Sequence, residues 1–168
     1  SVGVSNFNPA RMRRAHAALA KRGLPLAVNQ VHYSLLNREI ETNGVLETAK
    51  ELGVTIIAYT PLERGLLSGK YHKSPELLSQ MTGLRKTLMK RNLERSHPLI
   101  NAMKETAARH AATIAQVALN WVINFHGEIV VTIPGATRVR QAEESAGAMN
   151  FRLSDEEMGR LDEVSRRL

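Results

Sequence analysis

Polar side chains that can hydrogen-bond a small ligand stand at or near the carboxyl ends of four short apolar runs. Ser5-Asn6 ends the first run, Asn29-Gln30 lies in the second, and Tyr59-Thr60 ends the third. The fourth run, 129–133, leads into Pro134-Gly135-Ala136-Thr137. Amides and hydroxyls offer fixed donors and acceptors, and a tyrosine ring offers a flat apolar face. All four ends are thus polar or turn-forming.

Each group taken alone also has a structural explanation. Ser5-Asn6 can simply turn the chain, Gln30 can be a satisfied core amide, and Tyr59 can be a core aromatic whose hydroxyl is bonded. The functional interpretation therefore depends on the four groups meeting at one place.

The elements that would bring them together follow from the apolar pattern. Runs at 2–4, 27–31, 54–58 and 129–133 are short and continuous, which is typical of parallel strands buried on both faces. Helical spacing follows three of them, at 9–22, 42–52 and 139–149. We expect an α/β fold of four parallel βα units, in which all strand ends meet at one edge.

The remaining chain is expected to form one long loop and further helices. Residues 61–96 hold Gly65, Gly69 and Gly83 and predict either a mobile lid or a disordered linker. Helices are predicted over 98–110, 113–125 and 154–167, the last with Ser154 and Glu157 as a capping box. Trp121 is expected in the core. The whole chain, 1–168, is treated as one domain.

The net charge of +7 is concentrated in the predicted loop. Residues 64–95 carry eight basic and two acidic side chains, a net charge of +6. A solvated loop explains this without any ligand, and a polyanion, either nucleic acid or a phosphate-bearing cofactor, explains it as a binding surface. Aromatic residues make up only 4% of the chain, too few to stack single-stranded bases, so phosphate is favoured.

Several classes of protein and of site have no support. The chain has no cysteine, which suits a reducing cytoplasm, and no apolar run long enough to cross a membrane. Its histidines show no metal-ligand spacing, and Gly65 to Tyr71 departs from a nucleoside-triphosphate loop in glycine spacing and at Tyr71. The chain opens inside a predicted strand without an initiator methionine, so we expect further sequence upstream.

Four motifs, in this order and spacing, resemble the aldo-keto reductases along essentially the entire chain. They are Gly3-Val4-Ser5-Asn6-Phe7, Asn29-Gln30-Val31, the stretch from Ala58 to Tyr71, and Ile133 to Thr137 with Gln141 to Ser145. The resemblance implies the C-terminal half of a TIM (β/α)₈ barrel, strands five to eight, and NADPH as cofactor.

The resemblance also implies a role for particular residues. Ser5, Asn6 and Gln30 would hydrogen-bond the nicotinamide carboxamide, and Tyr59 would stack under the ring. The pyrophosphate would lie along Thr60, Leu62, Gly65 and Lys70, with Arg85 for the pyrophosphate or the 2′-phosphate. The adenosine end would contact Gly135, Ala136, Thr137, Gln141, Glu144 and Ser145, although Ser145 replaces the asparagine common there.

The family's catalytic tyrosine, aspartate, lysine and histidine come from its first four strands, so no catalytic residue is expected in this chain. The complete enzyme would reduce a small aldehyde or ketone, and this chain alone would be inactive and prone to self-association through open strand edges. Two other functions stay open: a nicotinamide-sensing module of a membrane channel, and a basic nucleic-acid-binding fragment, which the few aromatics disfavour.

Overall fold

The computed structural model describes residues 1–80 and 82–168, and the side chains of Gln80, Leu84 and Arg85 lie outside the described part. The chain divides into two compact units. The sheet unit comprises 1–61 and 122–135, and the helical unit comprises 62–121 and 136–168. Each unit is described by itself below.

The sheet unit is built on four parallel strands in the order β1-β2-β3-β4. Their bounds are β1 Val2–Ser5, β2 Leu26–His32, β3 Thr55–Tyr59 and β4 Val130–Ile133. All four predicted strands are confirmed with ends shifted by a residue, and the α/β class is confirmed with them. Parallel pairing brings the carboxyl ends of the strands to one edge.

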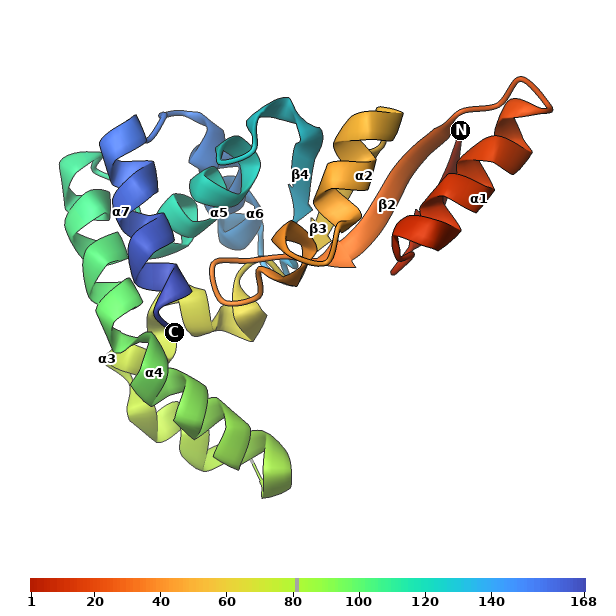
Figure 1. The fold of residues 1–168 in the computed structure, drawn as a ribbon. Coiled ribbons are helices and arrows are strands. Elements are labelled where there is room, and N and C mark those ends of the chain that lie inside the picture. Colours follow the sequence, from red (N-terminus) through yellow and green to blue (C-terminus); the bar gives the residue numbers. More distant parts are fainter. Residues whose placement is uncertain (81) are drawn as a thin grey trace. The chain divides into compact units, whose positions relative to one another are not determined.

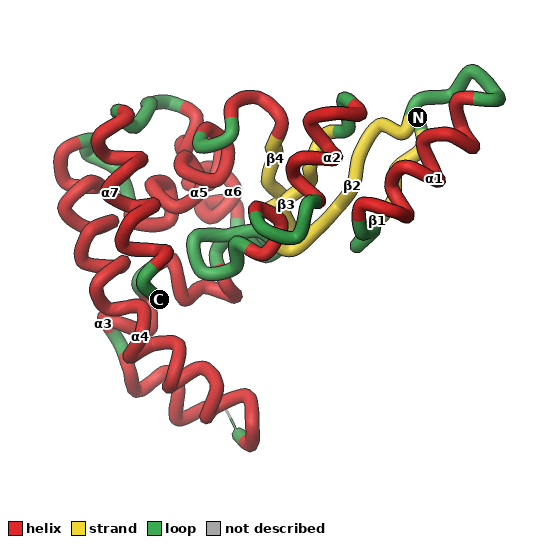
Figure 2. Tube along the Cα trace, in the orientation of Figure 1, coloured by secondary structure: helices red, strands yellow, loops and turns green. Residues whose placement is uncertain are grey.

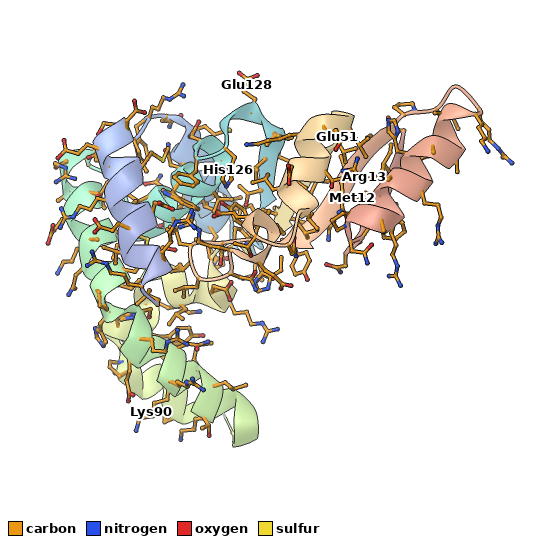
Figure 3. All side chains as sticks on the ribbon, viewed as in Figure 1. Met12, Arg13, Glu51, Lys90, His126 and Glu128 are labelled. Atoms are coloured by element: carbon orange, nitrogen blue, oxygen red, sulfur yellow. The ribbon has the colours of Figure 1, made fainter. Side chains whose placement is uncertain are left out.

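Helices α1 (Pro9–Ala20) and α2 (Val45–Leu52) lie side by side in the sheet unit (Figure 1). Asn8 begins α1, its side-chain oxygen accepting a hydrogen bond of 2.9 Å from the Arg11 amide. Arg13 of α1 and Glu51 of α2 form an ion pair between the two helices (Figure 3). Short 3₁₀ turns, η1 (Glu39–Glu41) and η4 (Gly127–Ile129), complete the unit.

The two faces of the sheet differ, and the expectation that every strand is buried on both faces is wrong. Residues that alternate along β2, β3 and β4 on one face are buried, among them Asn29, Ile56 and Val130. On the other face Val131 and Ile133 are 44% and 47% exposed. The outer strands β1 and β4 each pair with a single strand in the described chain, which leaves their residues less covered.

Most of the segment that we expected to be a loop is helical and belongs to the helical unit (Figure 2). Instead of a loop, residues 61–96 form η2 (Glu63–Ser68), α3 (Lys70–Lys73), η3 (Pro75–Gln80) and the beginning of α4 (Gly83–Arg109). The reason is that the segment has its own core, whose members Leu66, Leu67, Tyr71, Met89 and Leu93 are at most 8% exposed. Glycine content predicted a loop, but burial of these side chains stabilises helix.

Helix α4 begins at Gly83 rather than at Pro98, where the sequence predicted its start. Pro98 lies inside the helix, lacks an amide hydrogen and crowds the preceding turn. Figure 1 shows the helix changing direction partway along, as an interior proline causes. Lys90, one of the basic residues of this helix, projects from its surface in Figure 3.

The other helices of the unit are α5 (Ile114–Asn124), which continues into the sheet unit, α6 (Val139–Ala146), η5 (Gly147–Met149) and α7 (Asp155–Arg166). Trp121 is fully buried, and its ring nitrogen donates to the Met158 carbonyl at 3.2 Å, which confirms the core prediction. The capping box of Ser154 and Glu157 is confirmed as well. No helix within the described residues is long and apolar enough to span a membrane.

Candidate functional site

Strand register brings the predicted nicotinamide residues to one edge of the sheet unit. Ser5 lies opposite Gln30, His32 lies opposite Tyr59, and Tyr59 in turn lies opposite Ile133. These residues share the more exposed face of the sheet, because side chains alternate along each strand. Three of the predicted residues, Ser5, Gln30 and Tyr59, therefore come together as the motif order suggested.

A chain of hydrogen bonds links the ends of β1 and β3. Tyr59 donates its hydroxyl to Asn6 Oδ1 at 3.3 Å, and Asn6 Nδ2 donates to Ser5 Oγ, also at 3.3 Å. Ser5 Oγ and the Asn6 amide both donate to the Gln30 carbonyl, at 3.2 and 2.8 Å. Asn6 has a φ of 56°, a left-handed conformation that asparagine tolerates better than most residues. The turn after β1 is thus held in place by the site residues themselves.

The side-chain amide of Gln30 is different, because it has no hydrogen-bond partner among the described residues. Gln30 is half-buried and contributes only its backbone carbonyl to the network above. An amide with two donors and one acceptor left over can hydrogen-bond a polar ligand. Around it the sheet offers Ile57, Val131 and Ile133 on the same face, which would contact the flat surface of a ring.

Asn29, which precedes Gln30, has a structural role on the opposite face. It is fully buried, its Oδ1 accepts from the Phe7 amide at 3.3 Å, and its Nδ2 donates to the Phe7 carbonyl at 3.0 Å. This two-way bond fixes the turn that carries Asn6. The partner could not be read from the sequence because Phe7 and Asn29 are joined only through the register of β1 and β2.

The predicted residues at the end of β3 and after it fall in both units. Thr60, in the sheet unit, is half-buried with a left-handed φ of 55°. In the helical unit the Leu62 carbonyl accepts from the Gly65 amide at 2.9 Å. Gly65 has a φ of 89°, and a Cβ there would lie 2.6 Å from Lys70 Cε. Lys70 therefore extends over Gly65, with its ammonium 4.6 Å from the centre of the Tyr71 ring.

The ammonium of Lys70 is exposed, so it can attract a phosphate group. Arg85 was the second cation predicted for phosphate, and its side chain lies outside the described residues. Basic charge is also not confined to 64–95, because residues 1–38 hold six arginines and lysines and no acidic residue. Charge alone thus does not single out the phosphate site.

The predicted adenosine residues lie before and along α6, apart from Gly135, which belongs to the sheet unit: Ala136, Thr137 and Gln141 stand at its beginning, and Glu144 and Ser145 in its last turn. Gln141 Oε1 accepts from the Thr137 amide at 2.8 Å, from the Thr137 hydroxyl at 3.1 Å and from the Arg138 amide at 3.2 Å. Its oxygen is thus engaged in capping the helix. Ala136 and Thr137 are exposed, and Glu144 and Ser145 are half-buried on the same helix. The sequence analysis did not single out Arg138 and Arg140, two exposed cations in this turn.

Comparison with known proteins identifies the family. The model of the aldo/keto reductase family matches residues 1–166. The chain belongs to this family. Its four parallel βα units match part of the barrel of a solved thermostable aldo-keto reductase, crystallised with the inhibitor epalrestat, with a TM-score of 0.68 and 31% identity. The match covers 96% of this chain and 47% of that one.

Curated relatives of this aldo-keto reductase chain come from distant organisms. Chloroplastic pyridoxal reductase of Arabidopsis thaliana is 37% identical over 96% of this chain and 42% of its own length. The L-glyceraldehyde 3-phosphate reductase of Escherichia coli K12 is 32% identical over 96% of this chain and 48% of its own length. The chain therefore spans about half the length of the curated relatives it matches.

Proposed function

We propose that this chain is the NADPH-binding half of an aldo-keto reductase that reduces an aldehyde or ketone by hydride transfer. The observation that carries the proposal is the side-chain amide of Gln30, which has no hydrogen-bond partner in the described part of the chain and lies beside the network of Ser5, Asn6 and Tyr59. Membership of the family supports a nicotinamide cofactor, and the exposed Lys70 supports phosphate groups on it. When bound, NADPH supplies the hydride.

In this proposal the sheet unit orients the nicotinamide. Gln30, Ser5 and Asn6 bond the carboxamide and so select which face of the ring points toward the substrate. Tyr59 supports the ring from one side. Ser5 and Asn6 already bond each other, so the ligand replaces or extends these bonds while Gln30 makes a new one.

The helical unit and the adjoining turns would hold the rest of the cofactor. Thr60, Leu62, Gly65 and Lys70 would line the pyrophosphate, and Arg85 would contact a phosphate. Gly135, Ala136, Thr137, Gln141, Glu144 and Ser145 would surround the adenosine. For Gln141 the contact must come from its amide nitrogen, since the oxygen caps α6.

We further propose that these are strands five to eight of the complete barrel, that catalytic residues are absent from this chain, and that the complete enzyme acts in the cytoplasm on a small carbonyl compound. Nucleic acid is not a partner in this proposal. Expressed by itself, the chain self-associates through β1 and β4.

A fluorescence titration of the complete barrel with NADPH and with NADH tests the proposal. We expect NADPH to bind at least about tenfold more tightly, because a charge-assisted contact to the 2′-phosphate contributes about 1.5–3 kcal/mol. Gln30→Leu should weaken both nucleotides about two- to tenfold, the value of a typical hydrogen bond. Thr55→Val is the control, because Thr55 begins β3 at the end of the strand away from Tyr59, and it should leave binding of both nucleotides unchanged. Equal dissociation constants for NADPH and NADH would refute the cofactor preference, and an unaffected Gln30→Leu would refute the site.

A further inference from the structure

His32, the residue opposite Tyr59 in the sheet, has no role in the function proposed above. Its imidazole lies nearly parallel to the Tyr59 ring, with an angle of 12° between planes and 5.3 Å between ring centres. The two rings come from neighbouring strands in direct register. Such an offset stack restrains the tilt of the tyrosine ring.

Tyr59 is thereby held in two ways. Its hydroxyl donates to Asn6 Oδ1, which restrains the far end of the ring, and His32 covers one of its faces. Within the described residues no second ring stacks on Tyr59, and the side chain is half-exposed. No ring of the described chain covers the other face of Tyr59, which borders Ile133 on the neighbouring strand β4.

The hydrogen bonding of His32 indicates the role of one ring nitrogen. Asn37 Nδ2 lies 3.1 Å from His32 Nδ1, and an amide NH₂ donates. Nδ1 is the acceptor of this bond. Asn37 itself is placed by a turn in which its amide donates to Ser34 Oγ at 3.0 Å.

The charged groups near His32 lie beyond the strands. Strands β1 and β3 carry no acidic or basic side chain on either side of β2. In the segment after β2, Arg38 and Glu41 are paired with each other at 2.7 Å, and Glu41 also bonds His126.

We propose that His32 is a positioning residue for the nicotinamide: it holds Tyr59 from behind, and a proton on its ring disfavours the oxidised cofactor. This inference rests on the proposed function. The nicotinamide ring gains a positive charge when NADPH becomes NADP⁺, so a proton on His32 repels the oxidised ring and leaves the reduced ring nearly unaffected. Acidification thus shifts the preference of the site toward NADPH.

The stack is tested first without nucleotide. In NMR spectra of the complete barrel that contains this chain, the Tyr59 ring resonances should shift along the same pH curve as the His32 imidazole, and the shift should disappear in His32→Phe. Tyr59 signals that do not follow His32 overturn the inference, whatever the chain binds.

The second test measures dissociation constants of NADP⁺ and NADPH between pH 5.5 and 8. The ratio of the two cancels titration of the 2′-phosphate, which both nucleotides share. We expect the dissociation constant of NADP⁺, divided by that of NADPH, to rise roughly two- to tenfold on acidification in the unsubstituted chain. In His32→Phe this ratio should not change with pH. His16→Phe, on α1, is the control and should behave as the unsubstituted chain.

His32→Ala separates the remaining alternatives. Loss of the stack should weaken both nucleotides about two- to tenfold, and His32→Phe should restore binding. If His32 instead occupies the place of the nicotinamide, His32→Ala binds more tightly, which overturns the inference. If the unsubstituted chain binds neither nucleotide, the proposed function is refuted. The role of His32 in cofactor binding is then refuted too, even if the NMR test detects the stack of His32 on Tyr59.

Discussion

At the scale of single residues, the buried carboxylate of Glu41 joins two distant segments of the sheet unit. It accepts hydrogen bonds from the Tyr33 hydroxyl at 2.6 Å, from Arg38 Nη2 at 2.7 Å and from His126 Nε2 at 3.1 Å. Burial by itself would raise the pKa of Glu41, but the bonds from His126, Arg38 and Tyr33 outweigh it and lower the pKa to about 2. The charge therefore persists at any physiological pH.

Glu41→Gln is expected to destabilise the chain by about 3 kcal/mol, because Arg38 then lies buried without its counter-ion. Unfolding in urea, followed by circular dichroism, measures the change. Glu51→Gln, which breaks the exposed pair with Arg13, is the matched control and should leave the midpoint nearly unchanged. Similar midpoints for Glu41→Gln and the unsubstituted chain would show that the network contributes little.

The pKa of Glu41 also determines the pH range in which its charge stabilises the fold. Its folded value of about 2 lies below the usual 4.5, so the stabilisation is complete above pH 4.5 and is lost as pH falls toward 2. The pKa of Glu157 is also lowered to about 2, so its charge contributes to stability over the same pH interval. Glu41→Gln should therefore flatten, without abolishing, the fall in unfolding free energy between pH 5 and 2. An unchanged slope would contradict the assignment.

Tyr59 and Tyr33 offer a contrast between a binding and a core tyrosine. Tyr59 is half-exposed, whereas Tyr33 is fully buried. Tyr59→Ala should weaken NADPH binding by about 0.5–1.5 kcal/mol beyond the lost contact area. Tyr33→Ala should instead lower stability by about 3 kcal/mol or more. Melting curves beside binding curves distinguish the two, and a large stability loss in Tyr59→Ala would make Tyr59 a core residue.

At the scale of elements, helices α3 and α4 meet at a pair of histidines. The His72 and His97 rings are 4.9 Å apart and edge to face, and His72 Nε2 lies 3.1 Å from Ser96 Oγ. His72 Nδ1 is buried and has no hydrogen-bond partner within residues 1–80 and 82–168. Burial, and then the charge of His97, lower the pKa of His72 below 6.5.

Because the folded pKa of His72 is lowered, the neutral form is favoured in the folded state and acid opposes folding. Stability of the α3 and α4 contact is expected to fall as pH drops below about 6.5, the value of an unfolded histidine. His97→Gln removes the opposing charge and should reduce this loss. Hydrogen exchange of α3 amides at pH 7.5 and 5.5 measures it, and equal protection at both pH values would contradict the prediction.

At the scale of the whole molecule, the sheet has two open edges. Strands β1 and β4 each pair on one side only within the described chain, and neither carries a charged side chain. Charges on edge strands normally discourage pairing with other chains. A closed barrel of this type has eight parallel strands, and this sheet has four.

The 168-residue chain expressed by itself is therefore expected to dimerise or aggregate, and to show no reduction of a simple aldehyde by NADPH above a mock purification. Light scattering measures the association. Val2→Lys places a charge on β1 and should reduce it, whereas Leu24→Lys, at an equally exposed position outside the strands, should not. A monodisperse monomer would refute the edge argument, and turnover would refute the placement of catalysis outside this chain.

The sequence by itself was sufficient to predict features that depend on short stretches of chain. Strand positions, the capping box of Ser154 and the burial of Trp121 follow from apolar period and local hydrogen bonding, so their prediction is confirmed. The family, too, could be identified from the order and spacing of the motifs, and the family model that matches residues 1–166 confirms it.

Only the tertiary structure decided which distant residues meet. The 61–96 segment folds into helices because Leu66, Leu67 and Met89 find a core, which its glycines could not reveal. The Glu41 to His126 bond spans 85 residues, and the stack of His32 on Tyr59 depends on strand register. Register and packing arise from many weak contacts summed over the whole fold, and no local pattern records their outcome.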